Sequence, residues 1–176
     1  MKKDIPTKEQ CEALLISHNV QEEIIIHSKI VCDVARRIGR DLKWLRDRGP
    51  NIALITAAAM LHDIAKGQPD HAAAGGKLLR EQGYNLIAGI VESYNNIEFS
   101  GKTPVTEKEI VFIADKLVKG DQMVTVVYIY DNKIRSCTDK HQIAELEKCK
   151  ATALRIKTSI EKETEKNLEE LAIAES

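Results

Sequence analysis

The sequence predicts a single all-α domain of 176 residues, a helical bundle that ends in one long C-terminal helix. Aromatic residues make up only 4% of the chain, and 9 glycines and 4 prolines are too few for the many turns of a β-sandwich or β-barrel. Apolar residues recur at steps of three and four along most of the chain, which is typical of helices with one buried face. The length suits one domain with its own core, and we expect residues 1–176 to form it.

Capping residues mark the first two predicted helices. In "PTKEQCEALLIS", Thr7 and Gln10 have the spacing of a capping box at the start of a helix. The segment "NVQEEIIIHSKIVCDVARRIG" predicts a second helix over residues 20–38, with Asn19 at its start and Gly39 at its end. The polar stretch "DLKWLRDRGPN" that follows is expected to be a connector.

Three helices are predicted in the middle of the chain. The segment "IALITAAAMLHDIAK", residues 52–66, is apolar all round, which is typical of a buried helix, and Gly67 and Pro69 end it. The segments "DHAAAGGKLLREQ" and "YNLIAGIVESY" predict the fourth and fifth helices, and "NNIEFSGKTPV" predicts a loop.

A sixth helix is predicted for "TEKEIVFIADKLVKG", with a capping box formed by Thr106 and Glu109 and with Gly120 at its end. The next segment, "VTVVYIYD", has the β-branched and aromatic residues of a strand. A lone strand would have no partner in this sequence, so we expect the segment to be helical or irregular.

One long helix is predicted within residues 138–172, from about Lys140 to Leu171. At 1.5 Å per residue it would be roughly 48 Å long, which is longer than a domain of this size is wide. Its first half is expected to pack on the core. Its second half, "EKETEKNLEELAIAES", is highly charged and is expected to project, to fray, or to pair with a second subunit in a homodimer.

Charge and composition exclude several classes of partner. The 26 basic and 27 acidic residues nearly cancel, and no basic stripe is interleaved with aromatic residues, so we expect no nucleic-acid partner. No apolar run is long enough to cross a bilayer, and none follows the basic residues at the N-terminus. The four cysteines form no CxxC pair, which is typical of reduced thiols in a cytoplasmic protein without membrane contacts.

Four ionisable residues lie inside segments that are otherwise apolar and expected to be buried in the core. His62 and Asp63 are neighbours in "AAAMLHDIAK", His27 lies in "IIIHSKIV", and Asp115 lies in "VFIADKLV". A buried charge is costly unless something compensates it, and an ion held between the helices would do so. Any one of these residues alone could be a hydrogen-bonded core histidine or a capping aspartate. Together, two imidazoles and two carboxylates form a ligand set that suits Mn, Fe, Co, Ni or Zn better than Ca.

The order His27, His62-Asp63, Asp115 resembles the H…HD…D signature of the HD-domain metal-dependent phosphohydrolases. The segments "HSKIV", "AAMLHDIAKG", "DHAAAGGKLLREQGY" and "EIVFIADKLVKGD" carry the resemblance over residues 20–122. It implies an HD-domain-like helical bundle that holds one divalent metal ion (Mn, Co, Ni, Fe, Zn or Mg) through these four residues. It also implies hydrolysis of a small phosphorylated substrate, often a nucleotide, by a metal-activated water. Asp63 or Asp115 would orient that water and help to take its proton.

Two lysines are candidates for contact with the substrate. Lys66 lies three residues after Asp63 on the same helical face, where its charge would neutralise a phosphate beside the metal. The family often has a lysine at this place, although a solvated lysine in the last helical turn is the simpler alternative. Lys119, one turn beyond Asp115, could also reach a phosphate or could belong to an ordinary charged helix end.

His71 and Tyr94 decide how many metal ions the resemblance implies. Members of the family with two metals use further histidines, and His71 stands where one of them is found. Where another histidine would follow "IAGIV", this chain has Tyr94 or Asn95, which are poor ligands by comparison. We therefore expect a single metal, with His71 and Tyr94 beside the ligands or the substrate. The alternative is an HD-type module that binds a metal or ligand for regulation and has little or no catalytic activity.

Overall fold

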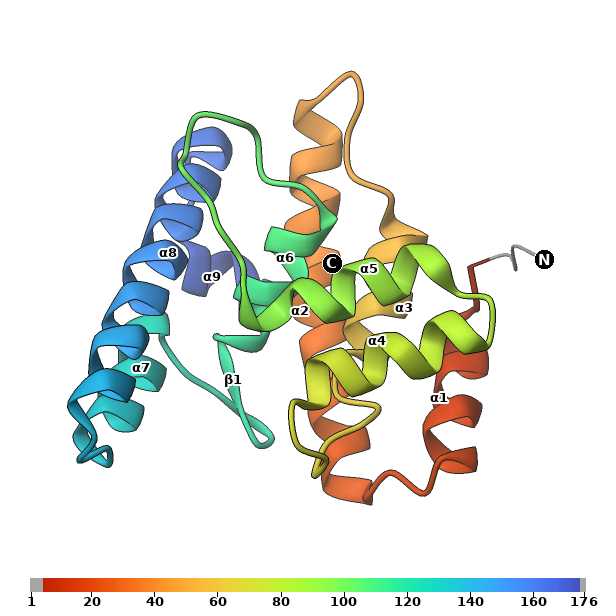
Figure 1. Ribbon diagram of the computed structural model, residues 1–176. Coiled ribbons are helices and arrows are strands. Elements are labelled where there is room, and N and C mark those ends of the chain that lie inside the picture. Colours follow the sequence, from red (N-terminus) through yellow and green to blue (C-terminus); the bar gives the residue numbers. More distant parts are fainter. Residues whose placement is uncertain (1–4, 175–176) are drawn as a thin grey trace.

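The computed structural model describes residues 5–174, and they form a helical domain with one short hairpin, as Figure 1 shows. No helix in this range is long and apolar enough to cross a membrane. The elements in chain order are α1 (Lys8–Ser17), α2 (Glu22–Leu45), α3 (Ile52–Leu61), α4 (His71–Glu81), α5 (Asn85–Glu92), the 3-10 turn η1 (Ser93–Asn95), α6 (Glu107–Asp115), β1 (Val118–Lys119), β2 (Gln122–Met123), α7 (Val126–Arg135), α8 (Lys140–Thr164) and α9 (Leu168–Ile173). The predicted all-α class is confirmed.

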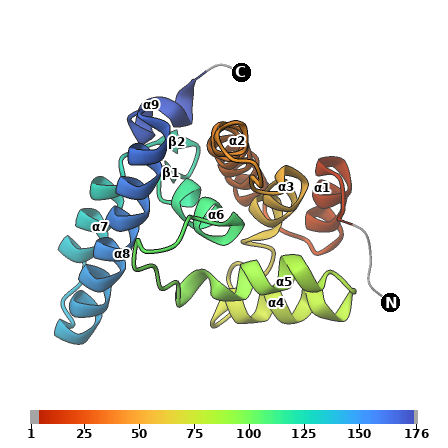
Figure 2. The same cartoon turned by 90° about the horizontal axis from the view of Figure 1, so that it is seen from above.

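The core is centred on α2 and α3, which pack against each other. Helix α1 lies on the outer side of α3, and the antiparallel pair α4 and α5 covers another side of the centre (Figure 2). On the other side of α2, α6 and the hairpin lie between the centre and α7, and α8 contacts both α2 and α6. The all-apolar helix α3 has six fully buried residues among its ten, as its sequence predicts.

Both predicted capping boxes are confirmed, the first between Thr7 and Gln10 and the second between Thr106 and Glu109. The predicted boundaries of the second helix are wrong. Asn19 adopts a left-handed conformation (φ 56°) after the end of α1, and α2 continues through Gly39 to Leu45. Gly39 faces α3, where a Cβ atom would lie 2.7 Å from Cδ1 of Ile55. This glycine therefore permits a close approach of two helices and does not end one.

The third and sixth helices are shorter than predicted, and both end at the residues that carry the chemistry. Helix α3 ends at Leu61, and the next residues form turns closed by bonds such as Lys66 N–H to the Asp63 carbonyl, at 2.9 Å. The His62 ring donates to the Ala59 carbonyl at 2.7 Å, which occupies an acceptor that a continuing helix would use. Helix α6 ends at Asp115, and Gly120 (φ 61°) lies in the turn between β1 and β2.

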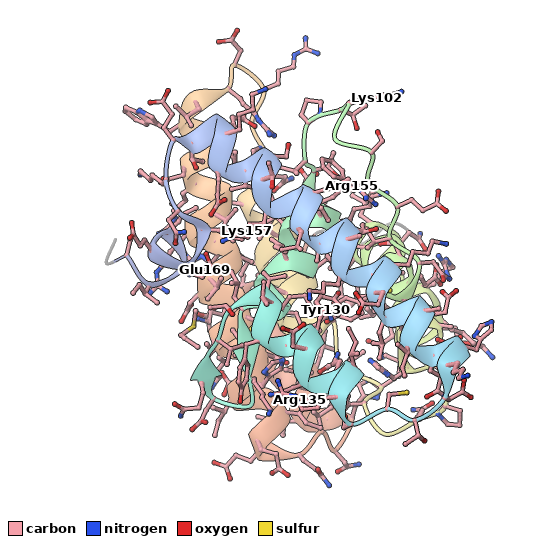
Figure 3. All side chains as sticks on the ribbon, turned by 90° about the vertical axis from the view of Figure 1, so that its left-hand side faces the viewer. Lys102, Tyr130, Arg135, Arg155, Lys157 and Glu169 are labelled. Atoms are coloured by element: carbon pink, nitrogen blue, oxygen red, sulfur yellow. The ribbon has the colours of Figure 1, made fainter. Side chains whose placement is uncertain are left out.

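The prediction of one long C-terminal helix is wrong. Helix α8 ends at Thr164, Glu165 turns the chain with a φ of 55°, and α9 folds back onto α2. The buried residues of α8 lie in its second half, from Thr152 to Thr164, and the helix packs on α7, α2 and α6. Lys157 of α8 pairs with Glu169 of α9, as Figure 3 shows. The charged segment is therefore folded against its own domain, and a homodimer through it stays a prediction.

The four cysteines should divide into two classes in an alkylation experiment. Burial raises the pKa of the Cys11 thiol to about 12 and that of Cys32 to about 11, and neither side chain is accessible. Since the thiolate is the reactive form, we expect Cys137 and Cys149 to react with iodoacetamide at pH 8 while the other two do not. Mass spectrometry of the native and the urea-unfolded protein tests this, with four modified thiols in the unfolded control. Modification of Cys11 in the native protein would contradict the packing of α1.

Candidate metal centre

The structure brings the four predicted ligands together. His27 comes from α2, His62 and Asp63 follow the end of α3, and Asp115 is the last residue of α6. Oδ1 of Asp115 lies 2.9 Å from Nε2 of His27 and 3.3 Å from Nε2 of His62. Asp63 Oδ2 lies 3.5 Å from His62 Nε2, and the candidate ligand atoms of His27, His62 and Asp63 are all within 4.8 Å of one another. The ligand atoms of His27, His62 and Asp63 are therefore close enough to hold a single ion, and Asp115 lies against both histidines.

Backbone carbonyls fix the orientation of both imidazoles. Nδ1 of His27 lies 2.8 Å from the carbonyl of Gly120, and Nδ1 of His62 lies 2.7 Å from the carbonyl of Ala59. Since a carbonyl only accepts, each Nδ1 is the protonated donor, and each Nε2 faces the carboxylates. This is the arrangement in which histidine ligands are held in metalloproteins.

The buried Nε2 atom of His62 gives a direct test of whether a metal fits. Its side chain is 1% exposed, and Nε2 has no hydrogen-bond partner among the described residues. In the neutral ring the Nε2 lone pair would face the oxygens of Asp63 and Asp115, which is repulsive unless a proton or a metal ion lies between them. A divalent metal with mixed nitrogen and oxygen ligands satisfies all of these atoms, so the residues fit the expected group.

Ionisation of the site favours the same conclusion. Burial would raise the pKa of Asp63, but the charge of His62, a hydrogen bond from His71 and the charge of Lys66 outweigh burial and hold this pKa well below its usual range. Burial also opposes the charge of Asp115, whose pKa is nevertheless lowered by Lys116, His27 and His62. Burial alone would lower the pKa of His62, but the Asp63 and Asp115 carboxylates raise it. Both carboxylates are thus anionic at neutral pH, and a bound metal would displace a proton from His62.

Lys66 and His71 both contact Asp63, on the more accessible side of the site. Lys66 Nζ lies 3.2 Å from Oδ2 of Asp63, and His71 Nε2 lies 3.4 Å from Oδ1. The side chains of Lys66 and His71 are 46% and 26% exposed, whereas that of Asp63 is 5% exposed. A substrate approaching from solvent would therefore meet Lys66 and His71 before it reached the carboxylate.

Tyr94 and Lys116 hold Asp115 from the opposite side. The Tyr94 hydroxyl donates to Oδ2 of Asp115. Lys116 Nζ lies 3.0 Å from the Tyr94 hydroxyl oxygen and 3.0 Å from Oδ2 of Asp115. The Tyr94 ring also lies beside the His62 ring, with centroids 5.7 Å apart. Tyr94 is therefore a hydrogen-bond donor to Asp115. Lys116, which follows Asp115 directly and is by its position a candidate for phosphate contact, is instead buried against Asp115.

Lys119 lies apart from the cluster. Its ammonium group is 5.4 Å from the centre of the Tyr128 ring in α7. The next residue in the chain, Gly120, contacts His27 through its backbone carbonyl. The structure therefore places Lys66, His71 and Tyr94 at the predicted site and places Lys119 in the adjoining region between β1 and α7.

Removal of divalent metal should lower the melting temperature of the protein. A ligand at one hundred times its Kd stabilises a fold by about 2.7 kcal/mol, which for this length corresponds to roughly 5–10 °C. We expect scanning calorimetry of the EDTA-treated protein to show a rise of this size in the melting temperature when Mn, Co, Ni or Zn is added. His27→Ala should abolish the increase, whereas His141→Ala, at the exposed start of α8, should retain it. No shift with any of these ions or with Mg would contradict a metal site.

Comparison with known proteins places this geometry in context. The family model of the HD domain matches residues 24–120. Two curated relatives are named tRNA (cytidine(56)-2'-O)-methyltransferase, one from Picrophilus torridus at 30% identity over 151 residues and one from Thermoplasma volcanium at 29% over 147 residues. Each match covers 74% of this chain but only 42% of the relative, so the chain spans less than half the length of either. No solved structure matches the chain.

Proposed function

Because this chain belongs to the HD-domain family, we propose that it is a divalent-metal-dependent phosphohydrolase that acts on a small phosphoester such as a nucleotide. The observation that supports this most directly is the cluster of His27, His62, Asp63 and Asp115, with the unpaired Nε2 of His62 facing two carboxylates. A metal bound there would activate a water molecule and polarise a phosphoryl oxygen.

The residues around the cluster have distinct roles in the proposed reaction. Asp63 is anionic and reaches the accessible side, so it orients the attacking water and accepts its proton. Lys66 neutralises charge on the phosphoryl oxygens, and His71 donates a hydrogen bond to them or to Asp63. Asp115 is held by Tyr94 and Lys116 and stays fixed during the reaction.

The proposal is tested with metal-stripped protein and a panel of nucleotides and simple phosphoesters, to which Mn, Co, Ni, Mg and Zn are returned singly. Release of phosphate from one class of substrate, restored by one or more metals, is the expected result. Absence of hydrolysis across the panel, with tight metal binding shown by calorimetry, would overturn it.

A regulatory or ligand-binding module with little turnover is the second candidate. Two observations support it. The relatives named as tRNA methyltransferases are longer proteins, and this chain spans only 42% of each, as a module of a larger protein would. In addition, Tyr94 or Asn95 stands where a further histidine would follow "IAGIV". Metal binding that stabilises the fold without hydrolysis would favour this candidate. A transfer RNA added to the same binding experiments would then test whether the module contacts the RNA that those names specify.

Substitution of Lys66 should impair the reaction without affecting the fold. The side chain is 46% exposed, so its loss removes a charge beside the phosphate and little packing. We expect Lys66→Ala to lower kcat/KM by about 10–100-fold, with Lys66→Arg retaining most of it. Steady-state kinetics measures this, and Lys77→Ala on the exposed face of α4 is the matched control. An unchanged kcat/KM for Lys66→Ala would show that Lys66 is only a solvated residue near the end of α3.

A further inference from the structure

A cavity lies between the β1–β2 hairpin and α7. Its volume is about 560 Å³, and its lining consists of Lys119, Tyr128, Ile129, Asn132, Lys133 and Ser136. The lining thus contains two lysines, one amide and two hydroxyl groups, and no acidic side chain. This composition favours an anionic ligand that accepts several hydrogen bonds.

Neither lysine of this cavity is neutralised by the protein. Among residues 5–174, no carboxylate lies within ion-pair distance of Lys119 or Lys133, although many other lysines of the chain form such pairs. Lys119 lies over the Tyr128 ring, and the Tyr128 hydroxyl lies near both Asn132 and Lys119, which lower its pKa. The polar groups of the cavity therefore converge with a net positive charge that has no counterpart.

Two links connect the cavity to the metal cluster. Lys119 precedes Gly120, whose carbonyl orients His27, so one residue separates the cavity wall from a ligand of the metal. The second link is electrostatic and involves Lys133 of α7. Partial burial of its ammonium group and the charges of Lys116 and Lys66 lower the pKa of Lys133, while Asp115 acts in the opposite direction. The cavity and the cluster therefore meet at the hairpin, where Lys119 lines the cavity and Gly120 contacts His27.

We infer that this cavity is a subsite for a second phosphate group, so that the favoured substrates carry at least one phosphate beyond the one that is hydrolysed. The inference rests on the proposed function for the position of the scissile phosphate, at the metal cluster. The cavity itself is defined by Lys119, Lys133 and Asn132, none of which is a ligand of the metal. The substrate class is then nucleoside diphosphates and triphosphates or bisphosphorylated small molecules.

Binding of inorganic pyrophosphate to the EDTA-treated protein tests the subsite separately from catalysis. We expect calorimetry to show binding that is weakened about tenfold by Lys119→Ala and about tenfold by Lys133→Ala, because each removes one charge-assisted contact. Lys162→Ala, an exposed lysine in α8, is the matched control and should bind as the unmodified protein does. Unchanged binding in both cavity variants would overturn the inference. So would variants that weaken binding of a short RNA but not of pyrophosphate.

Hydrolysis by the metal-loaded protein gives the second readout. The ratio of kcat/KM for a nucleoside diphosphate to that for the monophosphate should exceed one and should fall about tenfold in either cavity variant. Lysine-dependent pyrophosphate binding without hydrolysis of any substrate would retain the subsite and overturn the proposed function. Hydrolysis with the same kcat/KM ratio in the unmodified protein and both variants would retain the proposed function and overturn the subsite.

Discussion

Asp63→Asn is expected to reduce metal-dependent hydrolysis by roughly a thousandfold or more, which is the largest catalytic effect that this structure predicts. The substitution keeps the shape of the side chain and removes its charge. An amide cannot accept the proton of an attacking water, and it is a weaker ligand than a carboxylate. Asp63 contacts His62, Lys66 and His71, so three neighbouring side chains also lose their common anionic partner.

Three measurements separate this effect from loss of the fold or of the metal. Steady-state kinetics gives the loss of kcat, calorimetry gives the metal affinity, and thermal unfolding gives the stability. Asp47→Asn, at an exposed position after α2, is the matched control and should change none of them. Hydrolysis that persists within tenfold of the unmodified protein would exclude Asp63 as the proton acceptor. A reduced melting temperature in a protein that never hydrolysed any substrate would identify a structural metal site.

The sequence predicted the residues of the cluster because each is an ionisable residue inside an apolar segment. His62 and Asp115 are conspicuous in this way, and an ion between them is the simplest compensation for their burial. The supporting contacts were not predictable by the same reasoning. Tyr94 and Lys116 are 22 residues apart and meet only because α5, η1 and α6 fold against one another. Local patterns contain no information about such contacts.

The errors in the predicted fold have a common physical origin. Apolar spacing at steps of three and four continues across the break between α8 and α9, because both helices bury residues against the same core. The end of α8 depends on two local features, a left-handed Glu165 and the cap that Asn167 provides for α9. In the same way, Gly39 is read as a helix end from sequence, while the close approach of α3 is visible only in the structure.

Lys116→Met is expected to cause the largest loss of stability, about 3–5 kcal/mol in the metal-free protein. Lys116 is 6% exposed, and its ammonium group contacts Asp115 and the Tyr94 hydroxyl below the Phe112 and Tyr94 rings. Burial alone would lower the pKa of Lys116, but the Asp115 carboxylate raises it, so the lysine is charged at neutral pH. Without this charge, the buried Asp115 carboxylate keeps only its histidine and tyrosine contacts. For a chain of this length the loss corresponds to roughly 6–20 °C in melting temperature.

The metal and the partner residue make this prediction specific. A bound divalent ion also neutralises Asp115, so saturating Mn should recover part of the stability that Lys116→Met loses. The double variant with Asp115→Asn should be more stable than the sum of the two single effects, because it leaves no uncompensated charge in the core. Lys77→Met, on an exposed face of α4, is the control for the loss of a lysine. Additive effects in the double variant, measured by urea unfolding, would show that Lys116 and Asp115 do not form a coupled pair.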